Sequence, residues 1–138
     1  MMLICALVGM LLAEDSVSSI LTIIVALLGI ALCSGSAAAI NQVIDRNADA
    51  AMTRTDQRPL PQGELSVFHA SSFAFVIGII GALILYIYIN TLTMVLTLAS
   101  LIGYAFIYTV YLKRATPQNI VIGGLAGAAP PLLGWAAI

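Results

Sequence analysis

Long runs of apolar residues, separated by short polar segments, dominate this sequence. With His69 counted as neutral, residues 16–44, 65–112 and 115–138 carry no formal charge. At about 1.5 Å per residue, the first run is long enough for one helix across a hydrocarbon core of about 30 Å. The second run would reach about 72 Å as a single helix. It must therefore turn, and Asn90–Thr91 is the most favourable place.

This pattern predicts helices, because only helices and closed barrels satisfy the backbone polar groups in lipid. The runs are too long and too uniformly apolar for barrel strands. The predicted helices cover residues 1–13, 16 to just before Arg58–Pro59, 67–89, 92–112, and 119 onward. In the last helix, Gly123 and Gly127 have a spacing that permits close backbone approach. Pro130–Pro131 should kink this helix, and the bend could border a chamber or serve packing alone.

Composition supports a membrane protein. The chain is 62% hydrophobic and 8% charged, whereas an ordinary soluble domain is about 25% charged. We therefore predict an all-α membrane protein, a multi-helix transmembrane bundle that forms a single domain over residues 1–138. Residues 1–13 are too short to cross a bilayer and residue 138 lies inside an apolar run, so we expect a fragment truncated at both ends. Cys5 and Cys33 support neither a disulfide framework nor a zinc site.

Basic residues predict the orientation in the membrane. Arg46, Arg54 and Arg58 follow the second apolar segment, and Lys113–Arg114 follow the fourth. The opposite ends of the segments carry no lysine or arginine. By the positive-inside rule, the loop after the second segment faces the cytoplasm.

A row of polar residues, Asn41, Asp45 and Asp49, stands at the end of the second apolar segment. Each step of four residues advances about 400° around a helix, so the three side chains share one face. Carboxylate and amide oxygens suit Mg²⁺, which completes its octahedron with water and substrate phosphate. The row therefore predicts half of a metal–diphosphate clamp. Alternatively, the two aspartates are solvated interfacial charges or pair with neighbouring arginines, although a helix C-terminus disfavours anions.

These residues also carry a resemblance to a known family. The row, followed by residues 54–61, resembles the first aspartate-rich motif of the UbiA-type intramembrane prenyltransferases. Residues 44–49, 108–119 and 126–135 are similar to the haem branch of that family. The resemblance covers essentially the whole chain.

The resemblance implies a bundle of about nine membrane helices, about five of them here, with an active site open to the cytoplasm. Two aspartate-rich motifs would hold Mg²⁺ on the diphosphate of farnesyl diphosphate. The farnesyl group would pass to a vinyl group of protohaem IX, giving haem O. Asn41, Asp45 and Asp49 would be catalytic residues and metal ligands. Nothing after Glu64 is acidic, so we expect the second motif beyond residue 138 and expect the segment alone to be inactive.

The same resemblance assigns roles to further residues. Four basic residues would contact the diphosphate, namely Arg54, Arg58, Lys113 and Arg114. Tyr108 and Tyr111 would line the cavity, although aromatic residues at helix ends also serve as interfacial anchors. His69 could ligate haem iron, but a polar residue at the membrane boundary is the simpler interpretation. The expected location is the bacterial plasma membrane or the mitochondrial inner membrane, with the motif loop on the cytoplasmic or matrix side and no nucleic acid as partner.

Two other functions stay open at this stage. Another enzyme of the family would prenylate 4-hydroxybenzoate or a quinone precursor with the same acidic machinery. A non-enzymatic transporter or ion-conducting scaffold would bind a cation directly at Asp45 and Asp49. Transporters place such sites near the membrane midplane, commonly at broken helices, whereas these aspartates lie at the cytoplasmic end beside basic residues.

Overall fold

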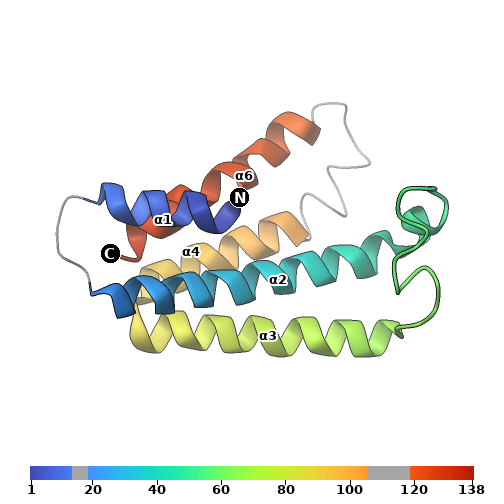
Figure 1. The fold of residues 1–138 in the computed structure, drawn as a ribbon, viewed down its shortest axis with the longest axis horizontal. Coiled ribbons are helices and arrows are strands. Elements are labelled where there is room, and N and C mark those ends of the chain that lie inside the picture. Colours follow the sequence, from blue (N-terminus) through green and yellow to red (C-terminus); the bar gives the residue numbers. More distant parts are fainter. Residues whose placement is uncertain (14–18, 106–118) are drawn as a thin grey trace.

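The computed structural model describes residues 1–13, 19–105 and 119–138, and this part of the chain is helical without any strand (Figure 1). Its five helices are α1 (Met2–Leu12), α2 (Ile20–Ala50), α3 (Val67–Tyr88), α4 (Thr91–Ile102) and α6 (Asn119–Ala136). Both α2 and α3 are long and apolar enough to cross a membrane, while α1 and α4 are shorter apolar helices. The prediction of an all-α membrane bundle is confirmed.

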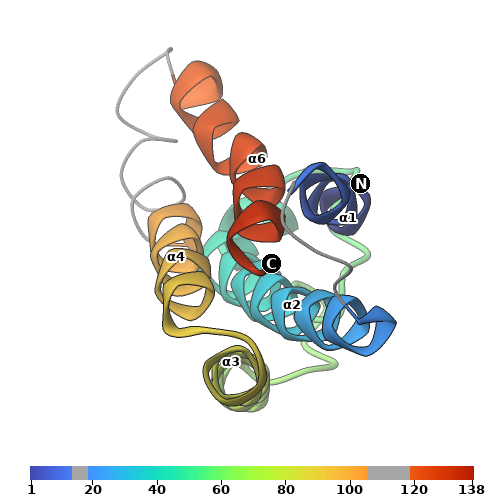
Figure 2. The ribbon, with the colours of Figure 1, turned by 90° about the vertical axis from the view of Figure 1, so that its left-hand side faces the viewer.

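The longest helix, α2, lies at the centre of the bundle (Figure 2). It packs most extensively against α3, and α1 packs most extensively against α6. With 31 residues at about 1.5 Å each, α2 is about 46 Å long and exceeds a hydrocarbon core of about 30 Å. The end that carries the polar row can therefore stand beyond the apolar layer.

Small residues bring α2 and α3 into close contact. A Cβ atom at Gly81 would lie 2.9 Å from the backbone oxygen of Gly29, so no larger residue fits there. Gly78 makes room for Ser36, whose buried hydroxyl donates to the backbone oxygen of Ala74 at 2.7 Å. Such small-residue contacts, with a hydroxyl bonded across them, are typical of helix pairs in membranes.

We expect the Ser36→Ala variant to lower the free energy of unfolding by about 1 kcal/mol, since an interhelical hydrogen bond in a membrane is worth about that much. Thermal unfolding in detergent of a full-length protein carrying this sequence measures the change. Ser34→Ala is the matched control, because Ser34 lines a cavity and not the α3 contact. Equal unfolding temperatures for the two variants would contradict the assignment.

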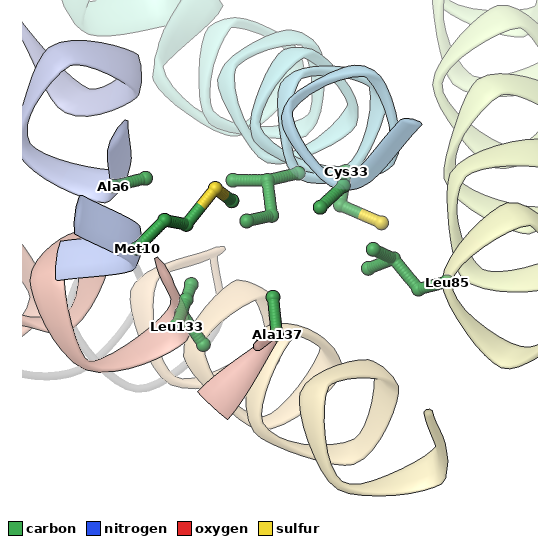
Figure 3. Packing of buried hydrophobic residues seen from close by; sticks show 8 residues of the cluster. Ala6, Met10, Cys33, Leu85, Leu133 and Ala137 are labelled. Atoms are coloured by element: carbon green, nitrogen blue, oxygen red, sulfur yellow. The ribbon is translucent and has the colours of Figure 1, made fainter. Parts of the chain in front are cut away.

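The buried core joins α1, α2, α3 and α6 (Figure 3). Both cysteines are free thiols, and Cys33 packs in this core beside Leu85. Where α1 meets α6, a side chain at Gly134 would clash with the backbone of Ala6. The close approach observed here thus occurs at Gly134, whereas no described residue lies within 4 Å of a Cβ built at Gly127. The core side chains are Ala6, Met10, Ala26, Ile30, Cys33, Leu85, Leu133 and Ala137.

The starts of α3, α4 and α6 and the end of α3 agree with the predictions to within about one residue. The predicted end of the fourth helix, at residue 112, lies outside the residues that the structure describes, and α4 itself ends at Ile102.

The end of α2 differs from the prediction. The predicted end was just before Arg58–Pro59, but the helix ends at Ala50. The Thr55 hydroxyl donates to the backbone oxygen of Asp49 at 3.0 Å, and the Met52 amide donates to the same oxygen at 3.3 Å. Because hydrogen bonds from this turn satisfy the Asp49 carbonyl near the helix end, the series of α-helical hydrogen bonds stops there.

The turn between α3 and α4 lies where the sequence predicts it. Asn90 caps α4, since its side-chain oxygen accepts a hydrogen bond from the Thr93 amide at 2.7 Å. Its side-chain nitrogen donates to the backbone oxygen of Ala136 at 2.8 Å. Asn90 thereby fastens the start of α4 to the end of α6, which continues through Pro130 and Pro131 without ending at them.

Candidate functional site

The predicted polar row lies on the last turns of α2, and its carboxylates are buried. Asp45 is 5% exposed and Asp49 is 7% exposed, whereas Arg46 between them is exposed. Carboxylates are seldom buried to this extent unless a cation or hydrogen-bond donors face them. The interpretation of Asp45 and Asp49 as solvated interfacial charges is therefore wrong, whereas the other alternative, pairing with a neighbouring arginine, is confirmed for Asp49.

One of the predicted diphosphate contacts lies on the row itself. The guanidinium Nη1 of Arg58 donates to Oδ2 of Asp49 at 2.7 Å. Arg54, in the same loop, is exposed. The other predicted contacts lie outside the residues that the structure describes, as do the predicted cavity tyrosines: Lys113, Arg114, Tyr108 and Tyr111.

The turn after α2 holds Arg58 in place. Thr55 is 4% exposed and bonds back to the end of α2 through its hydroxyl. The amide of Asp56 donates to the oxygen of Met52 at 2.9 Å, and that of Arg58 donates to the oxygen of Thr55 at 3.2 Å. The ion pair between Arg58 and Asp49 is thus supported by an ordered turn.

The donor set of the row fits Mg²⁺. Within the described residues, no three histidine, cysteine, aspartate or glutamate side chains gather into a metal-binding cluster. Asp45, Asp49 and Asn41 offer two carboxylates and one amide oxygen on one helix face. Mg²⁺ commonly takes one or two carboxylates and completes its coordination with water and substrate phosphate. The row has the chemistry of a half-site that a phosphate ligand would complete.

An apolar cavity of about 280 Å³ lies on the same face of α2 as the row. Cys33 and Ala37 line it, and Asn41 follows Ala37 by the same step of four residues. Pro130 also lines it, whereas Pro131 does not, so for Pro130 the structure supports a cavity wall. The remaining lining residues come from α1, α2, α4 with the turn that follows it, and α6: Met2, Ser34, Ala38, Thr97, Ser100, Leu101, Tyr104, Gly127, Ala129 and Leu133.

Sequence reasoning missed a row of hydroxyl groups that begins on α4. Thr97, Ser100 and Tyr104 line the cavity, and Thr93 precedes them by one turn. Thr93 and Thr97 are 0% and 3% exposed, and their Oγ1 atoms have no hydrogen-bond partner among the described residues. The signal was available, since steps of four, three and four residues in an apolar helix place polar side chains on one face.

His69 has a local structural role. The Ser66 hydroxyl caps α3 by accepting from the His69 amide at 3.2 Å, and it lies 2.6 Å from Nδ1 of the same residue. The side chain of His69 is exposed at the start of α3. This arrangement favours the interpretation as a polar residue at the membrane boundary.

Comparison with known families decides the classification. The profile of the UbiA prenyltransferase family matches residues 2–138. The chain belongs to this family. No solved structure gives a significant match.

Several relatives of this UbiA-family chain share the name protoheme IX farnesyltransferase. The chain is 59% identical to the protein of that name from Shewanella denitrificans. Proteins of that name from Saccharophagus degradans and Idiomarina loihiensis are 57% and 56% identical to it. Each match covers all 138 residues of this chain and 46% of the relative. The chain therefore spans just under half the length of these relatives.

Proposed function

We propose that this chain forms the donor-binding part of a protohaem IX farnesyltransferase. The reaction would transfer a farnesyl group from farnesyl diphosphate to a vinyl group of protohaem IX and give haem O. The observation that carries the proposal is the buried pair Asp45 and Asp49, which continues along one helix face from an apolar cavity. The names of the close relatives support the same reaction.

The polar row would bind the diphosphate end of the donor. Asn41, Asp45 and Asp49 would hold Mg²⁺, which neutralises charge on the leaving diphosphate when it is bound. Arg54 and Arg58 would donate to the phosphate oxygens, because a guanidinium matches their geometry. We propose Lys113 and Arg114 as further contacts.

The cavity would hold the apolar chain of the donor. Its volume of about 280 Å³ is close to the lower end of small-molecule pockets, which span about 300–1,000 Å³. Apolar walls such as Ala37, Pro130 and Leu133 would exclude water from the allylic carbon. Tyr108 and Tyr111 would complete the wall near the reacting carbon.

The proposal includes a position in the membrane. The polar row, Arg54 and Arg58 lie at the same end of the bundle, at the turn between α2 and α3. We infer that this end faces the cytoplasm, or the matrix in a mitochondrion, because basic residues stay on that side. A second acidic motif would be supplied from outside residues 1–138.

The choice of acceptor can be tested directly. A purified full-length enzyme carrying this sequence is incubated with farnesyl diphosphate, Mg²⁺ and either protohaem IX or 4-hydroxybenzoate. We expect a farnesylated product from protohaem IX alone, and its loss when EDTA removes the metal. Product from the aromatic acid alone would assign the chain to another branch of the family. Absence of any product, together with cation uptake into vesicles, would favour a transporter.

A further inference from the structure

We propose that Arg58 is the internal counterion of Asp49, which this carboxylate must exchange before the polar row binds metal. The proposal rests on the function proposed above and concerns the order in which the site is filled. Arg58 thus has two alternative partners, Asp49 in the empty site and the diphosphate in the filled one. Metal and diphosphate then bind cooperatively. Metal at Asp49 frees Arg58 for the diphosphate, and diphosphate at Arg58 frees Asp49 for the metal.

The geometry of the ion pair supports the first state. Nη1 of Arg58 lies 2.7 Å from Oδ2 of Asp49, and the Asp49 side chain is 10% exposed while that of Arg58 is 40% exposed. A carboxylate with so little access to water is stabilised by the charge on Arg58. The same contact makes one oxygen of Asp49 less available to another cation.

The turn between the two residues supports a built contact. The Thr55 hydroxyl donates to the backbone oxygen of Asp49 at 3.0 Å, and the backbone oxygen of Thr55 accepts from the Arg58 amide at 3.2 Å. Thr55 is itself buried. The backbone that carries Arg58 is therefore attached to the same helix end as Asp49, so the guanidinium starts within reach of the row.

The exposure of Arg58 supports the second state. Because 40% of the Arg58 side chain is already accessible to solvent, the guanidinium can move away from Asp49 without having to come out of a buried environment. A diphosphate beside the row offers it anionic oxygens in place of the lost carboxylate. A metal ion alone provides no new partner for Arg58, so the metal must compete with Arg58 for Asp49. Coupling between two ligands is reciprocal, so each should tighten the binding of the other.

Removal of Arg58 should therefore have opposite effects on the two ligands. Binding of Mn²⁺ alone, a paramagnetic substitute for Mg²⁺, should become roughly threefold tighter in Arg58→Ala, the scale of a partly exposed ion pair. Binding of inorganic diphosphate in the presence of Mn²⁺ should become at least roughly tenfold weaker, since a charge-assisted contact is lost. Electron paramagnetic resonance of free Mn²⁺ and calorimetry on the solubilised full-length protein measure the two constants.

Three further variants sharpen this test. Arg58→Gln removes the charge but keeps a hydrogen-bonding side chain, so it should show the effects expected of Arg58→Ala even if the alanine truncation impairs folding. Arg58→Lys keeps the charge, so its affinity for Mn²⁺ alone should stay closer to that of the parent protein. Arg54→Ala removes the same charge from an exposed position in the same loop, and it should change Mn²⁺ affinity less than Arg58→Ala.

The outcomes separate this proposal from the proposed function. If both neutral variants bind Mn²⁺ alone no more tightly than the parent, Arg58 is not the counterion, although the metal clamp can still stand. If the parent protein binds no Mn²⁺ even with diphosphate present, the clamp and the proposed function fail. Tighter Mn²⁺ binding with unchanged diphosphate binding would also overturn the exchange, because Arg58 would have no second partner.

Discussion

Replacement of either Asp45 or Asp49 by asparagine is expected to abolish farnesyl transfer in a full-length enzyme carrying this sequence. Both carboxylates are buried on one face of α2, beyond the turns that line the cavity, so an amide keeps the shape and removes the charge that would hold the metal. Loss of one preorganised electrostatic contact typically costs about 100- to 1,000-fold in rate. Product formation from farnesyl diphosphate and protohaem IX, measured by chromatography, checks the result.

The same variants should still insert into the membrane. The apolar parts of α2 and α3 are unchanged, and the polar row lies at the end of the helix. Glu64→Gln is the matched control, since it removes an exposed carboxylate from the loop that follows α2 and should retain activity. Full transfer by both aspartate variants would refute the clamp, and their absence from the membrane fraction would indicate a structural role instead.

Replacement of Gly81 by alanine should cause a large loss of stability. The new Cβ would lie 2.9 Å from the Gly29 oxygen and 3.0 Å from the Cys33 amide nitrogen. Both are backbone atoms, so α2 and α3 must move apart, and overpacking of this kind typically costs about 1–3 kcal/mol. Unfolding in detergent and the yield of monodisperse full-length protein report the change.

Gly35→Ala provides the control on the same pair of helices. A Cβ at Gly35 would meet only the Cδ1 atom of Ile77 at 3.6 Å, an ordinary van der Waals contact. Alanine is also favoured over glycine within a helix by about 1 kcal/mol. We therefore expect unchanged or increased stability. Similar losses in both variants would show that the contact at Gly81 is not the tight point of the interface.

Local signals made most helix boundaries predictable. The start of α3 follows Ser66 and the start of α4 follows Asn90, and each of these residues caps its helix with its own side chain. The end of α2 was not predictable in this way. It depends on the Thr55 hydroxyl reaching a carbonyl six residues earlier in the chain, which requires the conformation of the turn.

Long-range packing also escaped prediction. The spacing of Gly123 and Gly127 suggested a helix contact, yet a Cβ at Gly127 would contact none of the described residues, while Gly134 faces the backbone of α1. Spacing shows which residues share a face. It does not show which neighbour that face will meet, because the arrangement of the bundle decides this.

The candidate site could likewise be predicted only in part. The shared face of Asn41, Asp45 and Asp49 follows from helix periodicity alone, and the structure places all three on α2. The partner of Arg58 did not follow, since sequence allowed it to face either the diphosphate or the aspartates. The hydroxyl row that begins at Thr93 and Thr97 had a periodic signal, but threonine in apolar helices is too common to mark a cavity by itself.

Because one uninterrupted helix carries both the α3 contact and the acidic row, the number of residues between them fixes the direction of the row. Each residue inserted or deleted between Gly29 and Asn41 would rotate the row by about 100° about the α2 axis. Only a change near a whole turn would return the aspartates to the cavity side. Substitutions that leave the α3 contact intact therefore keep the direction of the row, whereas a change of length by a single residue does not.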